Sequence, residues 1–197
     1  RRPLDEGRTL LAAGLVEEAR AEARRTLEAL SRFAAPVIGI EPSSLLTLRD
    51  ELPSLLPGEA AANLAARALL LSEFLAREKP RLSLKPLPEP AAHIHGHCHQ
   101  KSFGAFPAAV ATLAMIPGLK VTPITSSCCG MAGSFGYEAE HQAVSRAMAE
   151  LSLLPAVRAA PPGHLIVADG TSCRHQIRDL SGREALHSVR VLERALA

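Results

Sequence analysis

Residues 125–137 read Thr-Ser-Ser-Cys-Cys-Gly-Met-Ala-Gly-Ser-Phe-Gly-Tyr, and this stretch is the most informative part of the sequence for the fold. It lies between a predicted strand, residues 120–124, and residues 138–154, whose apolar side chains recur with the period of a helix. A loop between a strand and a helix lies at the carboxyl edge of a parallel sheet, which is where α/β proteins place their binding sites. The adjacent cysteines therefore indicate a site at that edge.

Strands and helices alternate along the whole sequence, which predicts an α/β fold with a mainly parallel sheet. Each half of the chain is expected to be a small, mainly parallel sheet flanked by helices. In the second half, strands are predicted at residues 91–95, 120–124 and 164–168, and helices at 106–115, 138–154, 172–180 and 184–196. In the first half, helices are predicted at residues 15–30, 45–55 and 59–77, and one strand at 37–40.

The two halves repeat one another. Leu4-Asp5-Glu6-Gly7 in the first half matches Ser127-Cys128-Cys129-Gly130 in the second, and Ser44 matches Cys173. The position that would match Cys98 falls before the first residue. The opening strand of the first repeat is therefore expected to lie upstream, and the sequence is interpreted as the C-terminal part of a longer protein.

The segment 79–90 carries four prolines and is predicted to be a linker between the halves. Residues 1–90 are therefore interpreted as a degenerate, truncated first repeat that ends in this linker. Residues 91–197 are interpreted as the second repeat, which carries all four cysteines.

The composition excludes several classes of protein. The 197 residues include 22 basic and 20 acidic side chains, a net charge of +2, and only 3% aromatic residues. The chain has neither the positive charge nor the stacking rings typical of nucleic-acid binding. Its apolar runs are shorter than the roughly 18 residues that a transmembrane helix needs. The first residues lack the apolar region of a secretory signal, which predicts a cytoplasmic protein.

Cys98, Cys128, Cys129 and Cys173 each lie just after a predicted strand or in a loop that enters a helix. Such positions converge at the carboxyl edge of a parallel sheet, so the four thiols are expected to meet there. In a cytoplasmic protein they are better explained as metal ligands or redox groups than as disulfides. The alternative of four scattered buried thiols is weakened by the adjacent pair. Gly130 would let the backbone approach a bound sulfide closely.

Three segments resemble the CCG, or cysteine-rich, domain of iron-sulfur oxidoreductases. They are residues 97–101 (His-Cys-His-Gln-Lys), 127–136 (Ser-Cys-Cys-Gly-Met-Ala-Gly-Ser-Phe-Gly) and 169–176 (Asp-Gly-Thr-Ser-Cys-Arg-His-Gln). This family includes a subunit of heterodisulfide reductase, the iron-sulfur subunits of glycolate, lactate and glycerol-3-phosphate oxidases, and the C-terminal region of long FAD-linked oxidases. The sequence resembles most the last group, the D-lactate, glycolate and 2-hydroxyglutarate dehydrogenase type.

The resemblance implies that Cys98, Cys128, Cys129 and Cys173 bind an iron-sulfur cluster, with Gly130 against it. It implies that the cluster passes electrons between FAD in a partner domain or subunit and an acceptor, and that the substrate is a 2-hydroxy acid such as lactate, glycolate or 2-hydroxyglutarate. It also implies a ferredoxin-like segment among the partners. The implied location is the cytoplasm, where binding to partners could hold the protein at the surface of the inner membrane. No catalytic residue is predicted, so the chain is not expected to be active alone.

The sequence departs from the family pattern at the last motif, Cys-x-x-Cys, because Gly170 takes the place of its first cysteine. Four thiolates are left, which is the number for a 4Fe-4S cluster and one fewer than in the fullest pattern. In the first half, Asp5, Glu6 and Ser44 stand where thiols would be. Because these are hard ligands, no cluster is expected there.

Three histidines near the cysteines, His97, His99 and His175, are predicted to support the site by hydrogen bonding to the ligands or to helix ends. His97 and His99 belong to a run in which histidines are spaced by two residues, starting with His93 and His95. For this run, direct metal ligation is the alternative.

Two other functions fit four cysteines. The cysteines could hold a structural zinc ion, which would make the chain a folding or interaction module. Alternatively, Cys128 and Cys129 could carry out thiol-disulfide exchange, although a vicinal disulfide closes a strained ring. The spacing of Gly130, Gly133 and Gly136 does not match the G-x-G-x-x-G dinucleotide motif. The content of iron, sulfide and zinc would separate these functions.

Overall fold

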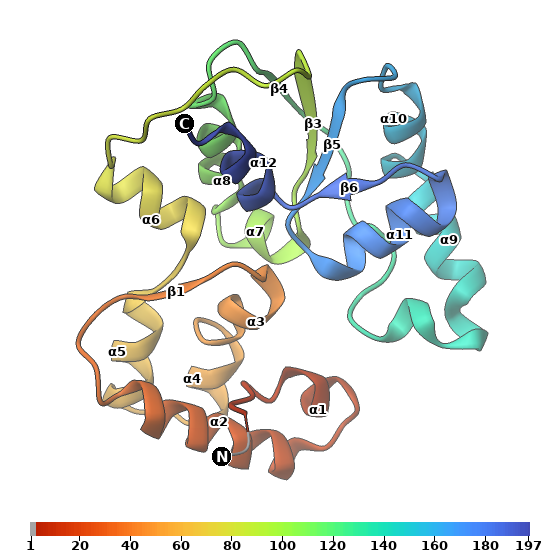
Figure 1. The fold of residues 1–197 in the computed structure, drawn as a ribbon. Coiled ribbons are helices and arrows are strands. Elements are labelled where there is room, and N and C mark those ends of the chain that lie inside the picture. Colours follow the sequence, from red (N-terminus) through yellow and green to blue (C-terminus); the bar gives the residue numbers. More distant parts are fainter. Residues whose placement is uncertain (1–2) are drawn as a thin grey trace. The chain divides into compact units, whose positions relative to one another are not determined.

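The computed structural model describes residues 3–197; Arg1 and Arg2, which open the first predicted half, lie outside the described residues. The chain is an α/β protein, as predicted, with two separate small parallel sheets flanked by helices (Figure 1). It divides into two compact units, and the division falls between Leu71 and Ser72.

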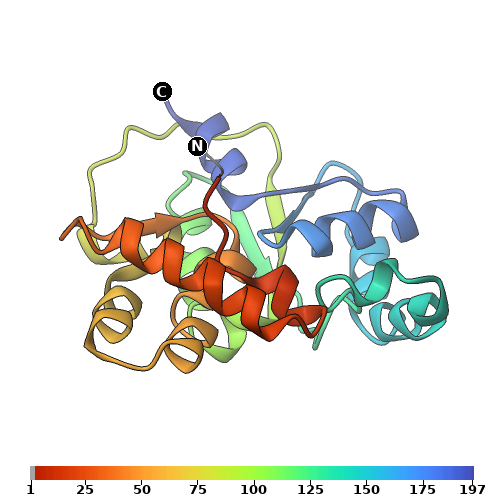
Figure 2. The same cartoon turned by 90° about the horizontal axis from the view of Figure 1, so that it is seen from below.

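The first unit has a two-stranded parallel sheet in which Val37 of β1 pairs with Ala68 of β2. The longest helix of this unit, α2, lies alongside α1 (Figure 2). It buries Ala19 and Ala23, which lie one turn apart on one face of the helix. The elements are α1 (Arg8–Ala12), α2 (Val16–Leu30), β1 (Val37–Gly39), α3 (Pro42–Thr47), α4 (Glu51–Leu55), α5 (Glu59–Arg67) and β2 (Ala68–Leu70).

The second unit has a four-stranded parallel sheet of order β4-β3-β5-β6. Its strands are β3 (Ala91–His95), β4 (Lys120–Pro123), β5 (Leu165–Ala168) and β6 (Ala185–Leu186). Its helices are α6 (Leu71–Glu78), α7 (Cys98–Ser102), α8 (Phe106–Ala114), α9 (Gln142–Glu150), α10 (Leu153–Ala159), α11 (Thr171–Ser181) and α12 (Ser188–Ala195). Two short 3-10 helices, η1 (Phe135–Tyr137) and η2 (Ala139–His141), precede α9. No helix within residues 3–197 has the length and apolarity to cross a membrane.

Helices cover both faces of this second sheet. Helix α8 packs against α12 and β4, whereas α10 packs against α11, which contacts β5 and β6 (Figure 1). The chain leaves β3 toward the edge strand β4, and it leaves β5 toward the opposite edge strand β6. The carboxyl ends of the neighbouring strands β3 and β5 therefore form a topological switch point, which is the expected place of a binding site in such a sheet.

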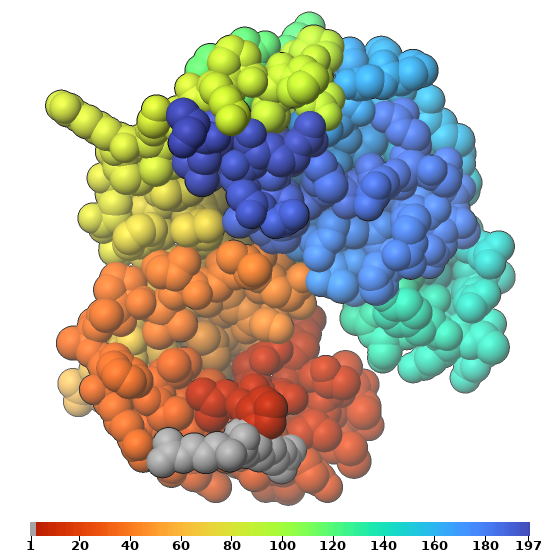
Figure 3. All heavy atoms as spheres, viewed as in Figure 1, coloured from red at the N-terminus to blue at the C-terminus, as the bar shows by residue number. Residues whose placement is uncertain are grey.

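The proline-rich segment 79–90 is part of the second unit. It runs antiparallel to the C-terminus: the Lys85 N–H donates to the Ala195 carbonyl at 2.8 Å, and the Ala197 N–H donates to the Ser83 carbonyl at 3.0 Å. The yellow-green segment and the dark blue C-terminus lie side by side in Figures 1 and 3. Backbone pairing thus holds this segment, and the division between the compact units falls earlier in the sequence.

Two short strands lie inside segments predicted to be helical. Strand β2 interrupts the predicted helix 59–77, and β6 lies at the start of the predicted helix 184–196, so that α12 begins only at Ser188. Short apolar runs such as residues 68–70 fit either a buried strand or a helix, and here the pairing with β1 decides. The predicted helix 45–55 is likewise divided, into α3 and α4.

Candidate metal centre

Two of the cysteines lie in the first turns of helices at the switch point. Cys98 is the first residue of α7, shortly after β3, and Cys173 lies in the first turn of α11, shortly after β5. The start of α7 is fixed by a reciprocal cap, in which the His97 side chain accepts the His99 N–H and Gln100 Oε1 accepts the His97 N–H at 3.0 Å. The sheet and this cap place Cys98 and Cys173 at the same switch point.

The other two cysteines come from the loop after β4. Lys101 Nζ holds this loop by donating to the carbonyl oxygens of Ser126, at 2.7 Å, and of Ser127. Gly130 has a φ of 90°, and a Cβ at this position would lie 2.1 Å from the carbonyl oxygen of Ser145, so the loop requires glycine. The Gly130 N–H donates to Cys128 Sγ at 3.2 Å, which fixes the sulfur.

The four thiols form one chain of contacts. Cys129 Sγ and Cys173 Sγ lie 3.3 Å apart, and hydrogen bonds link Cys128 to Cys129 and to Cys98. Cys129 and Cys173 are buried, whereas Cys98 and Cys128 are half-buried, and none of the four forms a disulfide. The thiol chain thus has a buried inner end and an outer end that reaches the surface.

Hydrogen bonding within the thiol chain separates the pKa values of its members. The pKa of Cys128 is lowered because first Cys129 and then Cys98 hydrogen-bond to its sulfur. The pKa of Cys173 is also lowered, chiefly by its hydrogen bond with Cys129. The pKa values of Cys129 and Cys98 are raised, in each case first by the hydrogen bond with Cys128. Because the thiolate is the form that binds metal, two of the four sulfurs are already favoured as ligands.

His95, at the end of β3, is absent from the predicted site residues but lies among these sulfurs. Its side chain is buried, and a ring nitrogen, Cys129 Sγ and Cys173 Sγ all lie within 4.8 Å of one another. Nδ1 is 2.7 Å from Ser126 Oγ, and the buried ring also hydrogen-bonds to the sulfur of Cys173, whose pKa it helps to lower. Its position in the sequence is the signal that could have found it, because His95 is the last residue of a strand that ends at the switch point.

The three histidines predicted to support the site lie in different places. A Cβ on Gly170 would lie only 2.5 Å from His97 Cδ2, so the His97 ring occupies the space that a side chain at position 170 would need. The His99 ring packs edge-on against the His97 ring. His175 Nδ1 lies 2.6 Å from the Tyr137 hydroxyl.

Asp169 joins the elements that carry the centre. Its buried carboxylate accepts hydrogen bonds from Gln100 Nε2, at 2.8 Å, and from the Ser188 N–H, at 3.0 Å. These bonds tie the end of β5 to α7 and α12. The sequence places Asp169 beside Cys173, but its partners lie 69 and 19 residues away in the chain, and no local pattern shows them.

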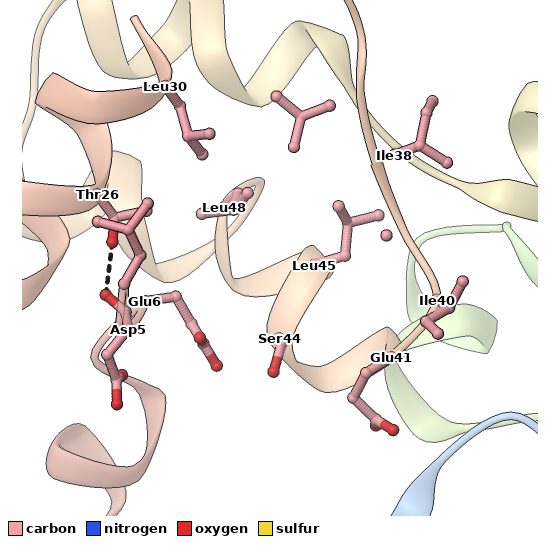
Figure 4. Close-up of a pocket in the computed structure, with 13 residues that line it drawn as sticks. Asp5, Glu6, Thr26, Leu30, Ile38, Ile40, Glu41, Ser44, Leu45 and Leu48 are labelled. Carbon is pink, nitrogen blue, oxygen red and sulfur yellow. Dashed lines mark hydrogen bonds between the residues drawn. The ribbon is translucent and has the colours of Figure 1, made fainter. Parts of the chain in front are cut away.

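The first unit has a pocket of about 340 Å³ where the counterparts of the thiol positions meet (Figure 4). Asp5, Glu6 and Ser44 all line it, together with Glu41 and apolar side chains such as Leu45. In Figure 4 the side chains of Glu6 and Ser44 lie across from each other. The positions that match the second-unit cysteines therefore converge in this unit as well, with oxygen in place of sulfur.

Neither a family model nor a solved structure matches the chain. The proteins that match it include dehydrogenase chains. The chain is 30% identical to a subunit of anaerobic glycerol-3-phosphate dehydrogenase of Escherichia coli K12, over 97% of its own length and 49% of that subunit. It is 32% identical to D-2-hydroxyglutarate dehydrogenase of the same strain, over 86% of its length and 17% of that protein. For D-2-hydroxyglutarate dehydrogenase of Pseudomonas putida, the identity is 30% over 84% of the chain and 16% of that protein.

The chain is thus homologous to parts of both dehydrogenases, and this homology confirms the predicted resemblance to a CCG-type domain. It spans about half the length of the glycerol-3-phosphate dehydrogenase subunit and less than a fifth of either D-2-hydroxyglutarate dehydrogenase.

Proposed function

We propose that the second unit binds an iron-sulfur cluster and transfers electrons within a larger FAD-linked oxidoreductase that acts on 2-hydroxy acids. The observation that carries this proposal is the chain of four contacting thiols at the switch point of a parallel sheet. The homology to two dehydrogenases supports the redox role.

The residues of the centre suit such a cluster. Cys98, Cys128, Cys129 and Cys173 supply the four thiolates that a 4Fe-4S cluster takes. The Gly130 N–H already points at a ligand sulfur, 3.2 Å away, and hydrogen bonds to sulfur are one means by which proteins set cluster potentials. A bound cluster would supply one-electron transfer.

The chain's own residues would hold and insulate the cluster. Cys129 and Cys173 are buried, so the surrounding core excludes water from the inner end of the centre, while half-buried Cys98 and Cys128 leave a short path to the surface for electrons. The hydrogen bond with Cys128 and then burial raise the pKa of Cys98, and the cationic Lys101 lowers it less strongly. Its positive charge would offset part of the negative charge of the thiolates.

The remaining parts of the reaction would belong to partners. The matched Escherichia coli proteins are named for glycerol-3-phosphate and D-2-hydroxyglutarate. A hydroxy acid of the second kind would be oxidised at FAD in a partner domain or subunit, and a ferredoxin-like segment would exchange electrons with the cysteine centre. The assembly would be cytoplasmic, or held at the surface of the inner membrane through its partners. Because the cysteine centre is proposed to relay electrons and not to bind the substrate, we expect no turnover by this chain alone.

Metal analysis of the chain, purified without oxygen, tests the cluster directly. We expect about four iron and four sulfide per chain and a visible absorption band. One colourless zinc ion per chain would instead support the structural zinc site. A metal-free chain with a Cys128–Cys129 disulfide would support thiol-disulfide exchange.

Kinetics of the whole assembly test the relay role. In the Cys129→Ser variant, substrate should still reduce the flavin at nearly the normal rate, whereas delivery of electrons to the acceptor should be slowed. Stopped-flow bleaching of the flavin and steady-state reduction of the acceptor measure the two steps. Equal impairment of both steps would contradict a relay and place the centre in the substrate chemistry.

A further inference from the structure

His95 is a buried polar residue of the second unit that the ligand set of four thiolates leaves unexplained. It is the last residue of β3, in register with Ala168 of β5, and only 1% of its surface is exposed. Strand β3 lies between β4 and β5, so the backbone of His95 has a fixed place at the carboxyl edge of the sheet.

The two ring nitrogens of His95 have different surroundings. Nδ1 lies 2.7 Å from Ser126 Oγ, and the Ser126 carbonyl is itself held by Lys101 Nζ at 2.7 Å. This contact fixes the orientation of the ring. Nε2 is buried and has no nitrogen or oxygen partner, and the His95 ring hydrogen-bonds to the sulfur of Cys173. Buried polar atoms almost always have a partner, and here that partner is one of the proposed ligand sulfurs.

The His95 ring thus lies at the buried end of the thiol chain. A ring nitrogen of His95, Cys129 Sγ and Cys173 Sγ lie within 4.8 Å of one another, so one metal ion between them would be within reach of all three. Metal-bound histidines usually have the arrangement found here, in which one nitrogen binds the metal and the other is held by a hydrogen bond.

The sequence around Cys173 also leaves a place for a nitrogen ligand. Position 170, which precedes Cys173 by three residues, is a glycine and offers no thiolate. Iron-sulfur centres accept imidazole in place of thiolate, and the exchange raises their reduction potential.

We infer that His95 Nε2 is a direct ligand of the metal group bound by Cys129 and Cys173. The centre would then combine one imidazole with four thiolates, which is five ligands, the number of cysteines in the fullest family pattern. This inference rests on the proposed function, because it takes the metal group to be the iron-sulfur cluster.

Pulsed electron paramagnetic resonance tests the ligand directly. The 197-residue chain, labelled with 15N-histidine, is reconstituted with iron and sulfide and then reduced. We expect a strongly coupled histidine nitrogen in the wild type and in His93→Gln, and loss of this coupling in His95→Gln. His93 is the matched control because it lies on the same strand and contacts His164, at 3.1 Å, instead of a thiol.

A cluster without histidine coupling, or coupling that survives in His95→Gln, overturns the inference and leaves the proposed function intact. If His95→Gln does not fold, His97→Gln takes its place, and loss of the coupling in that variant overturns the inference. If the wild-type chain assembles no cluster, the proposed function fails, and binding of Co²⁺ alone decides the role of His95. His95→Gln should then weaken Co²⁺ binding by about tenfold or more relative to His93→Gln; equal binding overturns the inference.

Discussion

The two units contain the same loop in different surroundings. Gly7 and Gly130 have φ values of 87° and 90°. A Cβ on Gly7 would lie 2.6 Å from the Ala19 carbonyl oxygen, and a Cβ on Gly130 would lie 2.1 Å from that of Ser145. Gly7 thus meets the backbone of α2 and Gly130 that of α9, in each case a later helix and not the element directly after the glycine, so the internal repeat extends to the geometry of the loop.

The side chains beside these glycines differ in their chemistry. The Gly7 N–H donates to Asp5 Oδ1 at 2.7 Å, and the Gly130 N–H donates to Cys128 Sγ at 3.2 Å. The loop conformation is held by backbone packing, whereas its ligand chemistry depends on the side chains alone. Carboxylates are hard ligands and thiolates are soft, so one loop geometry serves an ordinary pocket in the first unit and the candidate metal centre in the second.

The second unit also has a strand where the first has a pocket. Among the described residues β1 pairs only with β2, and residues of β1 line the pocket of Figure 4. In the second unit β3 pairs with β5, the counterpart of β1, and ends in His95. Strand β3 thus brings both Cys98, through α7, and an imidazole to the centre. The described part of the first unit contains no counterpart of either.

The largest expected difference between the units is in metal binding. Cys129→Ser removes a sulfur from the middle of the thiol chain, so the iron content of the reconstituted chain should fall below about a tenth of the wild-type value. Ser44→Ala, in the first unit, should leave the iron content unchanged. Iron and sulfide assays and the visible spectrum measure both. Loss of iron in Ser44→Ala would show that the first unit contributes a ligand.

The matched glycines should be equally intolerant of substitution. Gly7→Ala and Gly130→Ala each combine a positive φ with a collision against backbone, and each should cost at least about 2 kcal/mol in the free energy of unfolding. Gly14→Ala and Gly133→Ala are matched controls, because their φ values of 78° and 69° are also positive but the space around them is open. The controls should cost about 1 kcal/mol. Urea unfolding of the metal-free chain measures these costs, and a neutral Gly7→Ala would break the parallel between the loops.

Alkylation of the metal-free chain tests the predicted difference in reactivity between the two half-buried thiols, Cys128 and Cys98. Cys128 has a lowered pKa, which favours its thiolate, so its rate with iodoacetamide should change less than about twofold between pH 6 and 8. Cys98 is equally half-buried, but its raised pKa keeps it protonated, and it should react more slowly by a factor of about ten or more. Mass spectrometry of the labelled peptides gives both rates. Equal rates at pH 7 would contradict this assignment of charge.

The smallest expected effect is a pH dependence of stability from His93. Its pKa is lowered, first by burial and then by the nearby charge of His164. The unfolded chain therefore binds a proton at His93 more readily than the folded one. The stabilising contribution is complete above about pH 6.5, the ordinary pKa of histidine, and is lost as the pH falls below it. In His93→Gln, the free energy of unfolding should decrease less between about pH 6.5 and 5 than in the wild type. An unchanged decrease would show that other groups cause it.

Much of the fold and part of the centre could be predicted because they are local properties of the sequence. The period of the apolar residues shows strands that alternate with helices, and glycine and proline mark the turns between them. The positions of the four cysteines after strands follow from the same pattern. The repeated loop is also visible, since Leu4-Asp5-Glu6-Gly7 and Ser127-Cys128-Cys129-Gly130 end in the glycine that the conformation requires.

Only the tertiary structure decided the short strands and the surroundings of His95. Strands β2 and β6 are apolar runs that become strands because distant partners pair with them: Ala68 with Val37, and Ala185 with Ile166. The approach of His95 to Cys129 and Cys173 depends on the strand order β4-β3-β5-β6. A local pattern shows which residues follow a strand. It does not show which strands are neighbours, and that order determines which side chains meet at the switch point.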